Sequence, residues 1–295
     1  RDLEKYWPVK APQWVANAVV YQIFPDRFRR SERVLAQSGL DLLPWGSDPC
    51  KKGFQGGDLY GVIESLDYLE ELGISCLYLN PIFSSAAYHR YHSYDYFQVD
   101  PLLGGNEALC ALIEALHMRG MQIVLDGVFN HCGRGFWAFH HLLENGEASP
   151  YREWFSVHRW PINPYPQKGN DCGYSCWWND PALPKFNHEN PSVRKYLLSV
   201  ARYWTKKGID GWRLDVPDEV PADFWVGFRQ VVKGLNQDAW IVGEIWGDAR
   251  PWLKGNHFDG VMNYRIGWSS LSWSAGIKLK RSYINPLYPM NFVDS

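Results

Sequence analysis

Short apolar runs alternate along this chain with stretches in which apolar residues recur at helical spacing. Six runs are apolar at most positions and predict β-strands over residues 18–24, 74–80, 122–128, 209–216, 239–245 and 258–264. The helical spacing predicts helices over 62–72, 107–119, 193–207 and 224–235, the first three followed at once by Gly73, Gly120 and Gly208. Strands that are apolar on both faces and alternate with helices predict a parallel sheet covered by helices.

Polar residues gather where these strands end. They are Asn80, Asp126, Asn130, His131, Arg213, Asp215, Glu244 and Asn263. In a (β/α)8 barrel, the chemistry lies at this carboxyl-terminal edge of the sheet. A doubly wound open sheet is the alternative, but no GxGxxG motif follows the first strand. The pattern therefore favours an α/β fold of the (β/α)8 TIM-barrel type, with about six of its strands present.

The alternation of strands and helices is interrupted between residues 130 and 187. This stretch is rich in Trp, Pro, Gly and Asn and shows no clear helical period. Its length predicts an inserted domain after the third strand, which divides the chain into barrel residues 1–129, an insertion over 130–187 and barrel residues 188–295. Trp177 and Trp178 could form one wall of a cleft or could pack the insertion onto the barrel, and the sequence leaves both interpretations open.

Composition narrows the class of protein. Hydrophobic residues make up 46% and charged residues 21% of the chain, which is typical of a globular protein. The net charge of −2, with no basic run, argues against nucleic acid as a partner, and the apolar runs are too short for a membrane span. The six cysteines form no zinc motif. Cys172 and Cys176 could pair, but a reducing compartment fits as well, and without a visible leader pattern we expect a cytoplasmic protein.

Three acidic residues that end predicted strands carry the candidate chemistry. Arg213 precedes Asp215 by two positions, so on a strand both side chains share one face, and a guanidinium there would keep the carboxylate ionised, as a nucleophile requires. Glu244 has apolar neighbours, and partial desolvation would raise its pKa, as a general acid requires. An isolated acid at a strand end is more often a salt bridge or cap. Asp126, Asp215 and Glu244 together in one barrel predict the carboxylate chemistry of glycoside hydrolysis.

Four motifs carry a resemblance to a known family. They are Asp-Gly-Val-Phe-Asn-His at 126–131, Leu-Pro-Lys-Phe-Asn at 183–187, Gly-Trp-Arg-Leu-Asp-Val at 211–216 and Val-Gly-Glu-Ile-Trp at 242–246. In this order and at these separations, they resemble the conserved regions of the α-amylase family, glycoside hydrolase family 13. The resemblance covers nearly the whole chain, and it identifies the insertion with the family's domain B.

The resemblance implies a retaining double displacement on α-1,4, or also α-1,6, glucosidic bonds of starch, maltooligosaccharides or cyclodextrins. Asp215 would be the nucleophile and Glu244 the acid/base. Arg213 would orient Asp215, and Asp126 would support that arrangement. The implied substrate-binding residues are completed by His131, by Tyr91 within His-Arg-Tyr at 89–91, and by Trp246.

One motif points to a branch of the family and bears on metal binding. Val-Tyr-Gln-Ile-Phe-Pro-Asp-Arg-Phe at 20–28 is similar to the neopullulanase and cyclomaltodextrinase branch. That branch often carries Asn-Gly-Asp shortly after this motif as part of a calcium site, whereas this chain has Arg29, Arg30 and Ser31. Asp58 and Asn130 remain as two isolated oxygen donors, and two do not make a calcium site. The sequence therefore predicts no cofactor and leaves a calcium ion as an open alternative.

The family's third acid, an Asp preceded by His, has no counterpart after Glu244. Asp294 is not preceded by His, and the last two barrel strands are not visible in the pattern. The sequence therefore predicts a C-terminally truncated chain that is inactive alone. Three hypotheses stay open: a hydrolase, a transglycosylase that passes the sugar to another sugar, and an inactive remnant that at most binds glucan.

Overall fold

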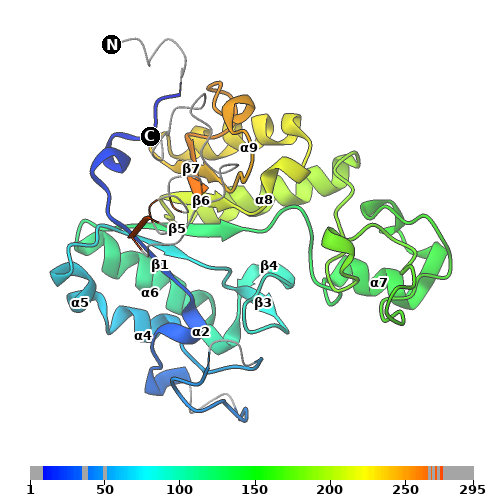
Figure 1. Ribbon diagram of the computed structural model, residues 1–295, viewed down its shortest axis with the longest axis horizontal. Helices are drawn as coiled ribbons and strands as arrows, with labels where there is room; N and C mark the ends of the chain where they lie inside the picture. Colours follow the sequence, from blue (N-terminus) through cyan, green and yellow to red (C-terminus); the bar gives the residue numbers. More distant parts are fainter. Residues whose placement is uncertain are drawn as a thin grey trace.

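Six parallel strands form one curled sheet in the computed structural model, which describes residues 9–34, 39–48 and 52–264, with 267, 270, 273 and 274 (Figure 1). In sheet order, the strands are β1 (Val20–Ile23), β2 (Cys76–Leu79), β5 (Gln122–Gly127), β6 (Gly211–Leu214), β7 (Trp240–Gly243) and β8 (Gly260–Val261). All six predicted strands are confirmed, each shorter than its apolar run. Within the described residues, β1 pairs only with β2 and β8 only with β7, so the sheet is an incomplete (β/α)8 barrel.

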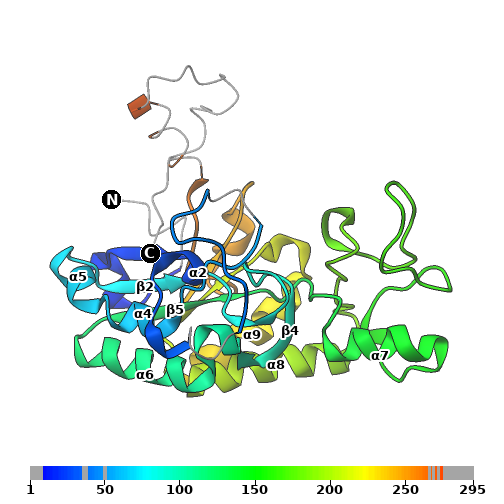
Figure 2. The same ribbon diagram turned by 90° about the horizontal axis from the view of Figure 1, so that it is seen from below.

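Helices cover the outer face of this sheet. They are α2 (Pro25–Phe28), α4 (Leu59–Ile63), α5 (Leu66–Glu71), α6 (Gly105–Met118), α8 (Pro191–Lys206) and α9 (Ala222–Leu235), and Figure 2 shows α6, α8 and α9 lying along the same side. The prediction of a single helix over 62–72 is wrong. Asp58 begins α4 by accepting a hydrogen bond from the Gly61 amide, and the Ser65 hydroxyl donates to the Gly61 carbonyl. This side-chain bond competes with the helical ladder between α4 and α5.

The strands place alternate side chains on two different cores, as their period of two requires. The outward side chains pack with the helices into the main core: Leu77, Leu79, Ile123, Leu125, Trp212, Leu214 and Ile241. The inward ones form a smaller core: Cys76, Tyr78, Val124, Trp240 and Val242. One turn of 3-10 helix, η1 (Gln13–Asn17), closes this inner core with Trp14 and Val15, because Trp14 packs edge-on against Trp240 at 6.0 Å.

The stretch between β5 and α8 stands out to one side of the sheet (Figure 1). It contains α7 (Trp137–Asn145) and the short turns η3 (Gly146–Ala148), η4 (Arg152–Trp154) and η5 (Trp177–Asn179). The expectation that this stretch lacks a regular helix is therefore wrong. The sequence reading also missed the antiparallel hairpin of β3 (Phe83–Ser85) and β4 (Ser93–Val99), which lies between β2 and α6. The boundaries at 129/130 and 187/188 remain predictions.

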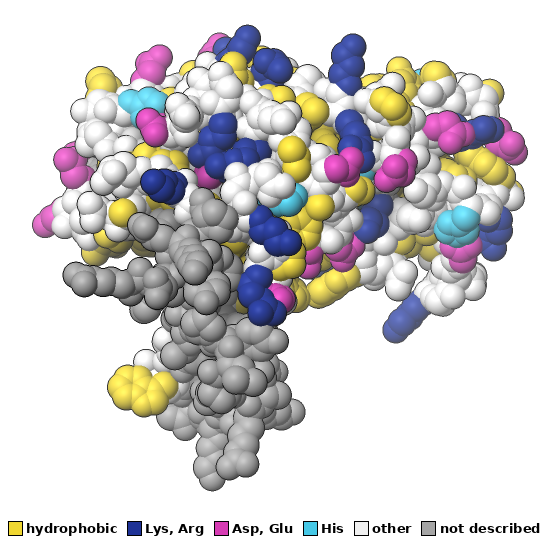
Figure 3. All heavy atoms as spheres, turned by 90° about the horizontal axis from the view of Figure 1, so that it is seen from above, with side chains coloured by type: hydrophobic (Ala, Val, Ile, Leu, Met, Phe, Trp, Pro, Cys, Tyr) yellow, Lys and Arg dark blue, Asp and Glu magenta, His cyan; other side chains and the backbone are white. Residues whose placement is uncertain are grey.

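The surface carries charges of both signs. On the face in Figure 3, Lys and Arg side chains lie among Asp and Glu side chains. No helix in the described part of the chain combines the length and apolar character that crossing a bilayer requires. The remaining short turns are η2 (Pro101–Leu103), η6 (Pro217–Glu219) and η7 (Arg250–Trp252).

Candidate active site

One guanidinium joins the three candidate carboxylates at the carboxyl ends of β5, β6 and β7. Arg213 Nη1 lies 2.9 Å from Asp126 Oδ1 and 2.9 Å from Asp215 Oδ1, and Arg213 Nη2 lies 2.7 Å from Glu244 Oε1. All four residues are buried. Asp126 and Glu244 continue the inward face of their strands, two positions beyond Val124 and Val242 of the inner core, and Arg213 shares this face because it lies in register with Val242. The structure thus brings together the four residues that the sequence placed at strand ends.

Tyrosines on one side hold Asp126 in place. The Tyr78 hydroxyl donates to Asp126 Oδ2 at 2.6 Å, and the Tyr91 hydroxyl lies 3.1 Å from the same oxygen. Asn80 Nδ2 donates to the Tyr91 hydroxyl at 3.0 Å, and Gln22 Nε2 donates to Asn80 Oδ1. The structure therefore places Tyr91 beside the carboxylates, as expected. The sequence reading gave no role to Tyr78, although its inward register on β2 was a usable signal.

Glu244 has more polar surroundings than its apolar sequence neighbours suggested. Its Oε1 accepts a hydrogen bond from the Tyr264 hydroxyl at 2.8 Å, and its Oε2 accepts one from the Val216 amide at 3.2 Å. Burial and the neighbouring Glu244 raise the pKa of Tyr264 to about 12, so this hydroxyl stays protonated and remains a donor. Tyr264 was missed by the sequence reading, because it lies three residues beyond the end of β8.

The pKa of Asp215 is raised, whereas the sequence predicted that Arg213 keeps this carboxylate ionised. Burial raises the pKa of Asp215 to about 8, the Asp126 and Glu244 carboxylates add to the rise, and Arg213 opposes it. Burial likewise raises the pKa of Asp126. The single positive charge of Arg213 is shared among three carboxylates, so it does not hold the pKa of Asp215 low. A cluster with three acids and one guanidinium retains a proton near neutral pH.

Val216, the residue after Asp215, has a strained backbone. Its φ of 37° and ψ of 52° lie in the left-handed region, which a β-branched side chain rarely occupies. This conformation accompanies the hydrogen bond from its amide to Glu244 Oε2. Strain of this kind costs about 1–3 kcal/mol and persists only where surrounding structure enforces it. The peptide between Asp215 and Val216 thus links the two central carboxylates through the backbone.

A row of aromatic rings runs from the insertion to the carboxylates. His131 stacks on Trp177 with centroids 5.3 Å apart, and Trp177 stacks on Trp178 at 4.7 Å. Trp246 meets Trp178 edge-on at 6.1 Å and contacts Tyr264 at 5.9 Å. Trp178 is 67% and Trp246 51% exposed, so these rings form a wall open to solvent, whereas Trp177 packs between its neighbours.

The His131 imidazole at the inner end of this row is neutral. Burial, aided by His92 and Lys185, lowers the pKa of His131 to about 3.

The two oxygen donors that the sequence left for calcium differ in their surroundings. Asp58 is occupied elsewhere, because its carboxylate accepts hydrogen bonds from the Gly61 amide and from the amide and hydroxyl of Ser31. The Asn130 amide nitrogen lies 3.3 Å from His131 Nδ1, whereas Asn130 Oδ1 is buried and has no hydrogen-bond partner among the described residues. Among the described residues, no group of three or more His, Cys, Asp or Glu side chains could hold a metal ion.

The third acid of the family has no counterpart within the described part after Glu244. Asp259 is buried there, but it lies 2.7 Å from both Arg229 and Lys233 and accepts a hydrogen bond from the Ile241 amide. These partners lie toward the start of β7, away from the carboxyl ends of the strands. Asp259 therefore has a structural role, and Asp294 lies outside the described residues.

Parallel (β/α) units with polar residues at the carboxyl ends of the strands define a domain of the (β/α)8-barrel class. The chain belongs to the α-amylase catalytic-domain family, whose model matches residues 22–292. It is 42% identical to a cyclomaltodextrinase from Thermoanaerobacter pseudethanolicus over 278 residues, which cover 94% of this chain and 48% of that protein. It is 47% identical to neopullulanase 2 from Thermoactinomyces vulgaris over 254 residues, which cover 86% of this chain and 43% of that protein.

A solved structure of a sugar hydrolase is also similar to this chain. The cyclic α-maltosyl-(1→6)-maltose hydrolase from Arthrobacter globiformis, in complex with its namesake sugar, matches with a TM-score of 0.87 and 44% identity, over 93% of this chain and 61% of that one. The chain spans about half the length of the curated relatives that it matches. Two of these relatives carry the names of the neopullulanase and cyclomaltodextrinase branch that the sequence resembles.

Proposed function

We propose that this domain hydrolyses α-glucosidic bonds in maltooligosaccharides, cyclodextrins or starch by a retaining double displacement. The observation that carries the proposal is the pair Asp215 and Glu244, bound to one guanidinium at the ends of the adjacent strands β6 and β7. Two closely spaced carboxylates, one attacking and one donating a proton, are what a retaining glycosidase requires. The names of the relatives, a cyclomaltodextrinase and a hydrolase of a (1→6)-linked cyclic sugar, support α-1,4 and α-1,6 bonds as targets.

The cluster supplies the proton that the reaction needs. Its three carboxylates share one positive charge and burial raises the pKa of Asp215, so one proton stays within the cluster. The reaction requires this proton on Glu244 and Asp215 ionised. Glu244 then protonates the leaving oxygen while Asp215 attacks the anomeric carbon, giving a glycosyl-enzyme. In the second step, Glu244 takes a proton from water, and the water oxygen displaces Asp215.

The residues around the pair hold the sugar. Tyr91 lies beside Asp126 and offers its ring and hydroxyl to the pyranose at the cleavage point. Neutral His131 can donate to a sugar hydroxyl. The exposed rings of Trp178 and Trp246 provide apolar faces for the next sugar units.

Transglycosylation by the same site is a second candidate, which the exposed aromatic row favours. Rings that bind a sugar on the leaving-group side also bind an acceptor sugar, and that acceptor then competes with water for the glycosyl-enzyme. Products longer than the starting maltooligosaccharide would identify this activity.

We also propose a cytoplasmic location. All five described cysteines are free thiols, and the Sγ atoms of Cys172 and Cys176 lie 3.9 Å apart, at hydrogen-bond distance and without a disulfide. Unpaired thiols at this distance suit a reducing compartment. The test is fractionation of the source cells, and recovery of the protein outside the cytoplasm would overturn the assignment.

The test of the proposed function follows product stereochemistry. The chain, and a version extended through the remaining barrel strands, are incubated with maltoheptaose and with γ-cyclodextrin, and proton NMR records the anomer released before mutarotation. We expect the α-anomer from the extended version, near-background product from the chain alone, and no product from Asp215→Asn in the extended version. Asp223→Asn is the matched control, because Asp223 is an exposed partner of Arg194 and should leave turnover unchanged. A β-anomer would overturn the retaining mechanism, and sugar binding without any product would establish the inactive remnant.

A further inference from the structure

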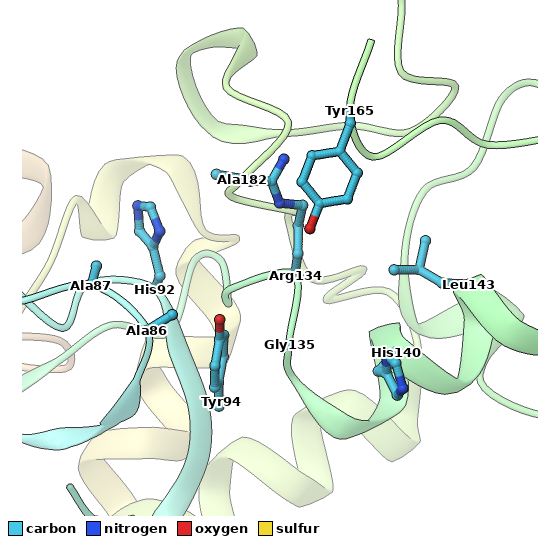
Figure 4. Close-up of a pocket in the computed structure, with 10 residues that line it drawn as sticks. All are labelled: Ala86, Ala87, His92, Tyr94, Arg134, Gly135, His140, Leu143, Tyr165 and Ala182. Atoms are coloured by element: carbon cyan, nitrogen blue, oxygen red, sulfur yellow. The ribbon is translucent and has the colours of Figure 1, made fainter. Parts of the chain in front are cut away.

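A second cleft lies between the β3–β4 hairpin and the insertion. It has a volume of about 380 Å³, within the range that holds a small ligand. Figure 4 shows His92 and Tyr94 on the hairpin side, and Arg134 with the ring of Tyr165 on the other. Its remaining lining residues are Ala86, Ala87, Gly135, His140, Leu143 and Ala182. None of the candidate active-site residues lines this cleft.

The floor of the cleft depends on two close approaches of backbone. A Cβ atom added to Gly133 would lie 2.5 Å from the carbonyl oxygen of His92, and one added to Gly135 would lie 2.5 Å from the ring of Tyr94. The Gly133 amide donates to the Ser93 carbonyl at 2.9 Å. Only glycine lets the start of the insertion lie this close to β4, so the two walls are held together at a fixed spacing.

The far wall presents an aromatic ring held in a defined position. Tyr165 is 72% exposed, yet the Arg134 guanidinium lies 4.0 Å from its ring centroid, and Arg134 Nη1 donates to the Pro164 carbonyl at 2.5 Å. A ring that is both exposed and fixed loses little conformational entropy when a ligand stacks on it.

The cleft presents aromatic rings and neutral polar groups around one guanidinium. Among the described residues, no carboxylate lines it, and Arg134, its one Lys or Arg side chain, lies against the Tyr165 ring and donates to the Pro164 carbonyl. Burial lowers the pKa of His92, so this imidazole is uncharged near neutral pH. Aromatic faces with neutral donors and acceptors match a pyranose ring, which has apolar faces and a rim of hydroxyls.

We propose that this cleft is a second glucan-binding site, which holds one or two glucose units of a long α-glucan away from the carboxylates. The assignment of this cleft to glucan rests on the proposed function only for the class of sugar, since binding here needs no catalysis. A chain held at the cleft stays close to the active site after each cleavage, which raises its effective concentration there. Short substrates cannot reach both sites and gain nothing.

The test compares long and short substrates in Tyr165→Ala, with Tyr68→Ala on α5 as the matched control, because both side chains are more than half exposed. Affinity electrophoresis in gels with soluble starch measures binding without turnover, and hydrolysis is assayed on starch and on maltotriose. We expect Tyr165→Ala to bind starch roughly tenfold more weakly, the loss of one stacked ring, and to hydrolyse maltotriose at the parent rate. Tyr68→Ala should match the parent in every assay.

Three outcomes overturn the proposal: no starch retardation of the parent chain, unchanged retardation of Tyr165→Ala, or an equal loss on maltotriose. The last would make the cleft part of the catalytic groove. Inorganic phosphate that binds the parent but not Arg134→Ala, with starch binding intact in that variant, would reassign the cleft to anions. If starch binding depends on Tyr165 but nothing is hydrolysed, the proposed function fails and the binding site stands.

Discussion

Replacing Asp215 by Asn should make the protein more stable while it abolishes turnover. The pKa of Asp215 rises from its ordinary value of 3.8 to about 8 in the folded chain, mainly because the carboxyl is buried. Below pH 4, the group is protonated in both the folded and the unfolded states. As the pH rises toward 8, the unfolded chain releases this proton while the folded chain keeps it, so the free energy of unfolding falls.

The magnitude follows from the size of the shift. Each pH unit between 4 and 8 costs at most about 1.4 kcal/mol, and the four units together set an upper bound of about 6 kcal/mol. The Asn side chain has no charge to desolvate, but it forfeits part of the attraction to Arg213. We therefore expect Asp215→Asn to exceed the parent chain by about 1–4 kcal/mol at pH 8, and by less at pH 5.5.

Urea unfolding followed by tryptophan fluorescence at pH 5.5, 6.5, 7.5 and 8.5 measures this difference. Asp223→Asn is the control, because its Arg194 partner lowers the pKa of Asp223, so its contribution is complete above pH 5 and should not vary across this range. A stability gap for Asp215→Asn that stays constant with pH, or that favours the parent at pH 8, would refute the reasoning.

Three further substitutions test the surrounding contacts. Arg213→Lys keeps the charge, but one ammonium cannot reproduce the fork that reaches three carboxylates. The value of kcat/KM should therefore fall about 10²–10³-fold, and a loss below threefold would contradict this role. Tyr264→Phe removes the donor to Glu244 and should lower kcat about tenfold with little change in Tm, and an altered Tm with normal kcat would indicate a purely structural contact. Gly133→Ala forces a methyl group against the His92 carbonyl and should lower the free energy of unfolding in urea by about 1–3 kcal/mol. At Gly234 nothing lies within 4 Å of an added methyl group, so Gly234→Ala should lower it by less than about 0.5 kcal/mol. Equal effects would contradict the close approach at Gly133.

The parts of the fold that could be predicted are those with an uninterrupted pattern. Each core strand is an apolar run, and the period of two along β6 places Arg213 and Asp215 on one face from sequence alone. The β3–β4 hairpin was missed because its strands mix polar and apolar residues and its loop carries no short turn motif. The break between α4 and α5 was missed because it depends on one side-chain bond from Ser65, which leaves the apolar spacing unchanged.

The residues of the candidate active site also fall into those that the apolar pattern predicts and those that it does not. Asp126 and Glu244 could be predicted because they directly extend strands that the apolar pattern defines. Tyr264 could not, because the expected strand over 258–264 ends at Val261, and the turn that follows carries Tyr264 to Glu244. The sharing of one guanidinium among three acids is also invisible in sequence, since it depends on distances across neighbouring strands.

The 3-10 helix that closes the inner core has a consequence for the order of folding. The Trp14 indole donates to the carbonyl of Asp238, a contact between residues 224 positions apart in the sequence. During synthesis, β1, β2 and β5 emerge long before β7, so their inward apolar side chains stay uncovered until Trp240 leaves the ribosome. Contacts of such long range slow folding, and exposed apolar faces invite aggregation in the meantime. The nascent chain is therefore most in need of chaperone protection between the synthesis of β5 and that of β7.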